Sequence, residues 1–313
     1  MAEPDYEKYV VRKPIYEVAP RVKNRQSPTM TFMSNTQVPE ANCYLEFGWI
    51  YGIPEPNPYV HEHVHDYDQI ILHVGGDPGN PEDLGGEIEF YVGGQPLTFN
   101  TTTGLFVPAG VRHGPIIWKE FSKPHVEMTI MLGTGSVKEG WGRSGITEAK
   151  SGLPEKTDDV DYEKYLVRKP IHEVIPPGVI NRQFPSMTLI SSAGVPGANH
   201  YIECGWVYFI PEPNPFVYEH VHRYNEIVLH WGGDPKNPLD LGGEVEFYVG
   251  GQPLTFNTTA VMWVPKGVKH GPLTWKKFKR PLMQMGFMIN CGNVMDAWGD
   301  SGISEPKPTP KPK

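Results

Sequence analysis

The strongest constraint in this sequence is an internal duplication. The stretch "YEKYVVRKPI" at 6–15 returns as "YEKYLVRKPI" at 162–171, and "GGEIEFYVGGQPLTFNTT" at 85–102 returns as "GGEVEFYVGGQPLTFNTT" at 242–259. The second pair is separated by 242 − 85 = 157 residues. Repeats in solenoids are only about 20–50 residues long, so this period is that of a whole domain. The sequence therefore predicts two tandem copies of one domain.

The boundaries of the two copies follow from composition. We expect the first domain at 1–146 and the second at 162–304. Between them, 147–161 is polar and rich in helix and strand breakers, as a linker is. The final segment, 305–313, is rich in proline and lysine and is predicted to be a disordered tail.

Each copy is expected to be all-β. The chain holds 34 glycines and 33 prolines, an excess that indicates many turns. Short apolar or alternating runs end at Gly-Gly or Pro-x-Gly turns, the pattern of a β-sandwich or barrel. Helix-period runs of useful length are missing, which disfavours an α/β fold. Short helical turns are expected only near 81–86 and 294–299.

Charge and cysteine content restrict the partners and the compartment. The net charge of −8 gives no basic face for nucleic acid. Cys43, Cys204 and Cys291 do not correspond between the copies, so we expect no disulfide. The polar N-terminus does not resemble a secretory signal, and no apolar run reaches the length of a membrane span. A cytoplasmic protein without membrane partners is the expectation.

Four residues of the second copy have the types and spacing of a metal site. His220, His222 and Glu226 are two and four residues apart, so on a regular strand they point to one face. A Pro-x-Gly turn at 265–267 then places His270 at the start of a neighbouring strand. Three imidazoles and a carboxylate suit Fe(II) or Mn(II) best, with Zn, Ni or Co as alternatives. Four protein ligands on an octahedral ion leave open positions for substrate, water or dioxygen.

The motif His220-x-His222-x₃-Glu226-x₆-Gly233, followed by Pro265-x-Gly267-x₂-His270, resembles the two signature motifs of the cupin superfamily. With the duplication, the chain is similar to bicupins, which have two tandem cupin domains. The resemblance covers the central part of each half. It implies two jelly-roll-like β-barrels, each able to hold one metal ion. It does not decide the reaction, because cupins include dioxygenases, decarboxylases, isomerases, lyases, sugar-binding regulators and storage proteins.

The first copy departs from the motif at one position. Subtracting 157 from the four ligand positions gives His63, His65, Gln69 and His113. Glutamine can coordinate through its carbonyl oxygen but brings no negative charge, so we expect weaker binding and a stronger Lewis acid. Because all three histidines are retained, we favour a working site of three histidines and one glutamine over a decayed one. This set also resembles the variant of some metal-dependent cupins, including bacterial hydroxynitrile lyases.

Other repeated residues are candidates for the surroundings of the metals. Tyr67, Tyr224, His73 and His230 share the strand parity of the ligands and are our candidates for catalytic hydrogen bonding or proton transfer, with a packed barrel interior as the alternative. The repeated "NRQ" contains Arg25 and Arg182, which can anchor a carboxylate, although a salt bridge is the commoner role.

These observations support three hypotheses on function. The first is a mononuclear non-haem Fe(II) dioxygenase acting on a small organic or aromatic acid. The second is a redox-neutral, metal-dependent decarboxylase, lyase or isomerase, in which the ion acts as a Lewis acid. The third is a non-catalytic module that binds a small molecule. The sequence leaves a homodimer or higher homo-oligomer open and does not name the substrate.

Overall fold

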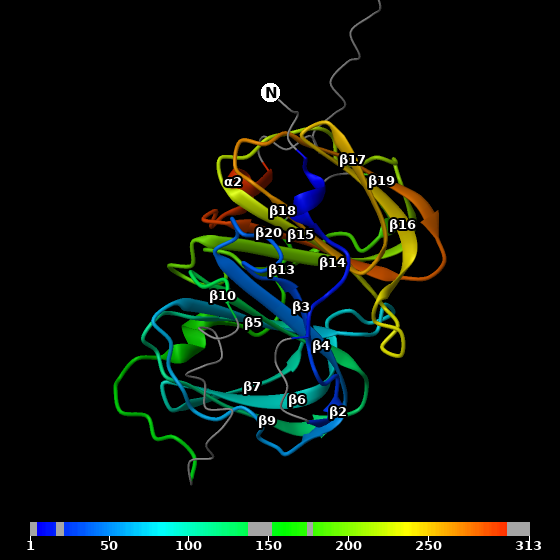
Figure 1. Ribbon diagram of the computed structural model, residues 1–313. Helices are drawn as coiled ribbons and strands as arrows, with labels where there is room; N and C mark the ends of the chain where they lie inside the picture. Colours follow the sequence, from blue (N-terminus) through cyan, green and yellow to red (C-terminus); the bar gives the residue numbers. More distant parts are fainter. Residues whose placement is uncertain (1–4, 17–21, 137–151, 174–177, 299–313) are drawn as a thin grey trace, which may run out of the picture.

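The computed structural model describes residues 5–16, 22–136, 152–173 and 178–298, which fold into two β-barrels (Figure 1). Each barrel has one seven-stranded and one three-stranded antiparallel sheet. The expected all-β architecture is confirmed. The proposed tail at 305–313 and the start of the proposed linker, 147–151, lie outside the described residues, and 152–161 contains no helix or strand.

The large sheet of the first barrel has the order β11-β8-β5-β10-β4-β2, with β3 also paired to β4, and its small sheet has the order β7-β6-β9. The bounds are β2 (Lys23–Arg25), β3 (Met30–Met33), β4 (Cys43–Glu55), β5 (Asp68–Gly75), β6 (Asp83–Val92), β7 (Gln95–Thr101), β8 (Thr103–Val107), β9 (His113–Phe121), β10 (His125–Leu132) and β11 (Leu166–Val167).

The second barrel repeats this arrangement, with the large sheet β1-β18-β15-β20-β14-β12, β13 paired to β14, and the small sheet β17-β16-β19. The bounds are β1 (Val10–Val11), β12 (Ile180–Arg182), β13 (Met187–Ile190), β14 (His200–Glu212), β15 (Asn225–Gly232), β16 (Asp240–Val249), β17 (Gln252–Thr258), β18 (Ala260–Val264), β19 (His270–Phe278) and β20 (Leu282–Ile289). Two 3-10 turns, η1 (Glu7–Tyr9) and η2 (Tyr162–Tyr165), and the helix α2 (Val294–Trp298) complete the described elements.

The two copies exchange their first strands. β1 of the first copy pairs with β18 of the second barrel, with Val10 opposite Met262, and β11 of the second copy pairs with β8 of the first barrel, with Leu166 opposite Leu105. Each repeat therefore completes the large sheet of the other. The repeat boundaries in the sequence do not coincide with the strands that build each barrel.

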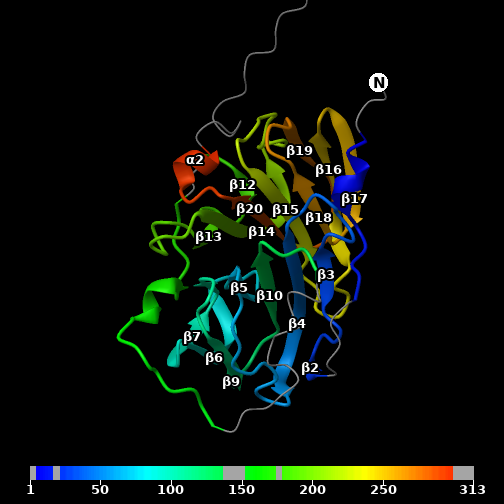
Figure 2. The same ribbon diagram turned by 60° about the vertical axis from the view of Figure 1, so that its left-hand side comes forward.

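The large sheets face each other in the middle of the molecule, and the small sheets lie outside (Figures 1 and 2). On β5, Ile70 and Leu72 point into a core shared by both barrels, whereas Ile71 points into the interior of its own barrel. On β15, Ile227 and Val228, the counterparts of Ile70 and Ile71, divide in the same way. Both faces of these strands are thus buried, which explains their continuous apolar sequences.

Two local predictions have opposite outcomes. The helical turn expected near 294–299 is confirmed by α2, whereas the one near 81–86 is wrong, because the backbone makes turns at Asp77 and Asn80 and enters β6 at Asp83. The three cysteines are free, as expected. None of the helices in the described part of the chain has the length and apolar character needed to cross a bilayer.

The exchanged segments generate a prediction about stability. A Cβ on Gly250 would lie 2.1 Å from Cε2 of Tyr6, whereas one on Gly251 would meet nothing within 4 Å. Both glycines have positive φ, +57° and +82°, so alanine costs about 1 kcal/mol or more of backbone strain at either position. We expect Gly250→Ala to lower the free energy of unfolding by roughly 1–3 kcal/mol more than Gly251→Ala in urea denaturation.

Adding Tyr6→Ala should remove most of this difference, because the ring would no longer obstruct the new methyl group. Equal losses for the two glycine variants would contradict the seating of the first repeat's N-terminal segment on the second barrel.

Candidate metal centre

Three different backbone settings bring the four predicted ligands of the second barrel together. His220 forms an isolated antiparallel bridge with His270, the first residue of β19. His222 lies in the turn before β15, where its carbonyl accepts from the Gly267 amide at 2.9 Å. Only Glu226 lies on the regular strand β15. The four residues come together as expected. However, His220 and His222 precede β15, so the expectation that they lie on one regular strand with Glu226 is wrong.

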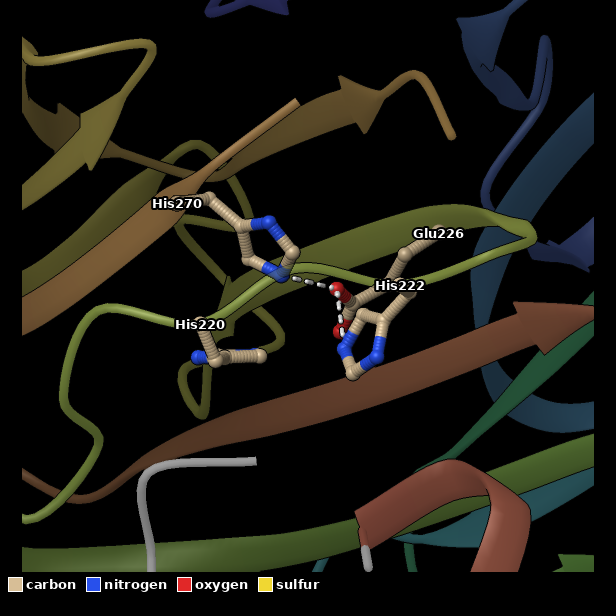
Figure 3. A group of neighbouring side chains, drawn as sticks. All are labelled: His220, His222, Glu226 and His270. Atoms are coloured by element: carbon tan, nitrogen blue, oxygen red, sulfur yellow. Dashed lines mark ion pairs between the residues drawn. The ribbon is translucent and has the colours of Figure 1, made fainter. Parts of the chain in front are cut away.

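The ligand atoms of His220, His222, Glu226 and His270 all lie within 4.8 Å of one another, and all four residues are buried (Figure 3). Oε2 of Glu226 lies 3.0 Å from Nε2 of His270 and 3.7 Å from Nε2 of His222. Among the described residues, Nε2 of His270 and Oε2 of Glu226 have no partner with hydrogen-bond geometry. Buried polar atoms without partners are rare, and a divalent transition metal ion fits this donor set.

Each imidazole is held from behind at Nδ1. The Nδ1 atoms of His220 and His270 lie 2.7 Å and 3.0 Å from the carbonyl oxygens of Tyr218 and Val268. A carbonyl can only accept, so these Nδ1 atoms carry the proton and the Nε2 lone pairs face the common centre. Hydrogen bonds of this kind fix both the ring orientation and the tautomer of metal-binding histidines.

Tyr224 performs the same task for His222. Its hydroxyl lies 2.9 Å from Nδ1 of His222 and donates to the carbonyl of Ala297 in α2 at 2.9 Å. Because the hydroxyl proton is used on that carbonyl, the oxygen accepts from Nδ1–H. Nε2 of His222 therefore also presents its lone pair to the centre, and α2 supports the site through Tyr224.

The protonation states of these ligands are set by their burial and by the one carboxylate among them, that of Glu226. Burial lowers the pKa of His220 to about 4. For Glu226, burial alone would raise the pKa, but the contact with His270 and the neighbouring imidazoles lower it to about 2. For His270, burial lowers the pKa and the adjacent Glu226 carboxylate raises it above its usual value overall. The quartet thus keeps Glu226 ionised, which is the state that binds a cation.

The first barrel repeats the geometry without the charge. The imidazole ligand atoms of His63, His65 and His113 come together in one buried group, and Oε1 of Gln69 lies 2.7 Å from Nε2 of His113. Nδ1 of His63, His65 and His113 contacts the His61 carbonyl, the Tyr67 hydroxyl and the Val111 carbonyl at 2.7, 2.8 and 2.9 Å. Burial, the largest cause, lowers the pKa of all three imidazoles. They are neutral, as metal ligands must be.

A cavity lies beside each group of ligands. In the second barrel it has a volume of about 30 Å³ and is lined by His220, Glu226 and His270, by apolar side chains, and by Arg182, Glu203 and Gln284. In the first barrel it has a volume of about 20 Å³ and is lined by His63, Gln69 and His113 together with Arg25, Tyr59 and Glu127. The two arginines, which the sequence singled out only weakly, face the sites.

The four catalytic candidates lie elsewhere. Tyr67 and Tyr224 contact the ligands His65 and His222 from behind and do not line the cavities. His73 and His230 are fully buried deeper in the barrels, where burial lowers the pKa of each to about 3. A catalytic role for these four residues stays a prediction.

The carboxylate and amide side chains that line the two cavities beside the metal ligands were not predicted from the sequence: Glu203 and Gln284 in the second barrel, and Glu127 in the first. The signal was present, because Gln284 minus the repeat offset of 157 is Glu127. The same offset relates Gln69 to Glu226, so both exchanges between glutamate and glutamine are visible in the sequence.

The support from Tyr224 can be tested directly. We expect Tyr224→Phe to weaken metal binding by the second barrel about 10–100-fold, because the His222 ring would lose its hydrogen-bond partner. Competition with a chelator measures this affinity. Tyr218→Phe is the control, since Tyr218 binds His220 through its carbonyl and not its hydroxyl. Equal affinities for the two variants would contradict the role assigned to Tyr224.

Comparison with known proteins gives a result at the level of fold. No family model and no curated protein matches the chain. Among solved structures, the vicilin from Corylus avellana (hazelnut) has a TM-score of 0.56 at 12% identity, over 93% of this chain and 91% of that one. AerE from Microcystis aeruginosa has a TM-score of 0.51 at 13% identity, over 88% and 96%.

The oxalate decarboxylase of Lactobacillus farciminis, in a formate complex, has a TM-score of 0.51 at 11% identity, over 85% of this chain and 82% of that one. These structures are two-domain cupin-fold proteins. With the duplicated barrels and the paired histidine motifs, they show that this chain has the bicupin fold, two tandem cupin domains in one polypeptide.

Proposed function

We propose that this chain is a metal-dependent enzyme whose working ion is held by His220, His222, Glu226 and His270. The observation that carries the proposal is the convergence of four buried donors on one cavity, with Nε2 of His270 and Oε2 of Glu226 lacking a hydrogen-bond partner within the described residues. Buried donors on a cavity are typical of a catalytic site, since a structural site has no room for substrate.

The residues of this site have different roles. A divalent ion held there would supply Lewis acidity or, if it is iron, redox chemistry. Glu226 neutralises half of the charge of such an ion, and the Nδ1 hydrogen bonds hold the imidazoles in position. Val217, Val228 and Phe247 line the cavity and give part of its wall an apolar surface.

Two reactions remain within this function. The first is the Fe(II) dioxygenase reaction on a small substrate, for which three imidazoles and one carboxylate are a suitable ligand set. The second is a redox-neutral decarboxylation, lyase or isomerase reaction. One of the similar structures is an oxalate decarboxylase, but a likeness at this level of identity concerns the fold alone.

Glu203 favours the redox-neutral reaction. It lines the cavity of the second barrel, and its carboxylate accepts from the Ser186 hydroxyl at 2.9 Å. Burial raises its pKa, partly offset by the charge of Arg182. A buried carboxyl group with a raised pKa can give or take a proton, which a redox-neutral reaction needs and which the ligand histidines, turned to the ion, cannot supply.

The decisive experiment compares metals under controlled oxygen. Protein freed of metal is loaded anaerobically with Fe(II), Mn(II) or Zn(II), and turnover of a panel of small organic substrates is followed together with oxygen uptake. Oxygen consumption by the Fe(II)-loaded protein, but not by the Mn(II)- or Zn(II)-loaded protein, supports the dioxygenase. Turnover without oxygen supports the redox-neutral reaction, and in that case we expect Glu203→Gln to lower kcat about 10²–10⁴-fold.

His222→Ala should abolish either activity, while His172→Ala, which removes an exposed histidine outside both sites, should not. If the purified protein retains no transition metal and no tested metal gives turnover, the enzymatic function is wrong and the non-catalytic binding module becomes the better hypothesis. Metal binding by the three histidines and the glutamine of the first barrel, a homo-oligomeric state and a cytoplasmic location also stay proposals.

A further inference from the structure

One pair of equivalent positions distinguishes the two cavities beyond the metal ligands. Glu127 on β10 corresponds to Gln284 on β20, and each side chain lines its cavity together with the arginine of that cavity. At the metal position the exchange runs the other way, since Gln69 corresponds to Glu226. Each cavity thus has one glutamate and one glutamine at these two positions, in opposite order.

In the first barrel the arginine is already neutralised. Nε of Arg25 lies 3.0 Å from Oε2 of Glu127, and the two side chains are only 7% and 5% exposed. The hydroxyl of Tyr59 donates a hydrogen bond to the same carboxylate oxygen, and the Arg25 guanidinium lies over the Tyr59 ring, 4.8 Å from its centroid. The positive charge of this arginine is therefore already compensated by a carboxylate of the protein.

In the second barrel the same arginine lacks its carboxylate. Arg182 keeps its position over an aromatic ring, now that of Phe216, at 4.7 Å. Phe216 has no hydroxyl and Gln284 has no charge. Nε of Arg182 and Oε1 of Gln284 are both buried without a hydrogen-bond partner in the described ranges. A buried guanidinium with an unused donor is costly, which points to a ligand that completes it.

Glu203 does not replace the missing carboxylate. It lines the same cavity, and its charge raises the pKa of Arg182 against the lowering effect of burial. However, Oε2 of Glu203 is engaged by the hydroxyls of Ser186 and Tyr201 at 2.9 Å and 3.4 Å. Within the described part of the chain, no ion pair joins Glu203 to Arg182.

We propose that Arg182 binds the carboxylate of a small organic acid, and that only the second barrel accepts such an anion. Arg182, Gln284, His220, Glu226 and His270 line one cavity, so an acid anchored on Arg182 extends towards the metal ligands. The Gln284 amide can turn its NH₂ group to the same carboxylate. This inference rests on the proposed function, because it treats that cavity as the substrate site.

The first barrel is then a site for a neutral ligand. Its arginine is held by Glu127 and its metal position by the uncharged Gln69. In the second barrel the carboxylate is that of Glu226, among the metal ligands, and the position beside the arginine is the uncharged Gln284. Arg182 is therefore available to bind an anion.

The positions of the glutamate and the glutamine can be exchanged experimentally in the whole chain. Gln284→Glu gives the second barrel the ion pair of the first, and Glu127→Gln gives the first barrel the free arginine of the second. Wild type and both variants are titrated calorimetrically, metal-free and zinc-loaded, with acetate, lactate and pyruvate, and with acetamide and lactamide as neutral counterparts. Metal content and thermal unfolding are measured on the same samples.

We expect wild type to bind one carboxylate per chain, about tenfold or more tighter than the amide, since a hydrogen bond to a charged group contributes about 1.5–3 kcal/mol. Gln284→Glu should weaken carboxylate binding about 10–100-fold with the same metal content. Glu127→Gln should add a second carboxylate site. This second arm keeps the test decisive if Gln284→Glu does not fold.

Unchanged carboxylate affinity in folded Gln284→Glu, or equal affinity of wild type for acid and amide, would overturn the inference. So would an unchanged stoichiometry in folded Glu127→Gln. Its failure is distinguishable from that of the proposed function. If the protein takes up no metal but carboxylate affinity still depends on position 284, the enzyme proposal fails and the anion site stands.

Discussion

The candidate site depends on hydrogen bonds made behind the imidazoles. Three imidazole nitrogens and one carboxylate oxygen lie within 4.8 Å of one another, and a hydrogen bond at the far side of each ring holds a nitrogen lone pair towards their centre. Backbone carbonyls do this for His220 and His270, and the Tyr224 hydroxyl does it for His222. The same contacts recur in the first barrel, so they belong to the repeated fold and not to one copy.

The two copies have diverged in the position of a charge. Glu226 lies among the metal donors of the second barrel, and Glu127 lies beside the arginine of the first. A nearby carboxylate stabilises a buried arginine or a buried divalent ion, since an unpaired charge in a barrel interior is costly. Each barrel has one carboxylate at these two positions. In the first barrel it compensates the charge of the arginine, and in the second it lies among the metal ligands. A single fold thereby provides two cavities with different ligand preferences.

The exchange of first strands makes the two barrels one structural unit. β1 and β11 each close the large sheet of the opposite barrel, and the shared core buries Phe47 against Trp231 with ring centroids 6.1 Å apart. Separating the copies would remove a strand from each sheet and expose this core. The two copies are therefore joined by strand pairing and by a shared core, and not by the linker alone.

The amino-acid sequence alone determined the duplication, the all-β class, the convergence of His220, His222, Glu226 and His270, and the change to Gln69, because these are properties of repeat offset and local residue spacing. Only the tertiary structure decided what surrounds them. Arg182 and Gln284 are 102 residues apart in the chain and meet the metal ligands only when β12 and β20 enter one sheet. Likewise, the pairing of each first strand with the opposite barrel depends on long-range packing, which leaves no local pattern in the sequence. Local spacing specifies which side chains can share a face, but strand order and barrel closure specify which faces meet.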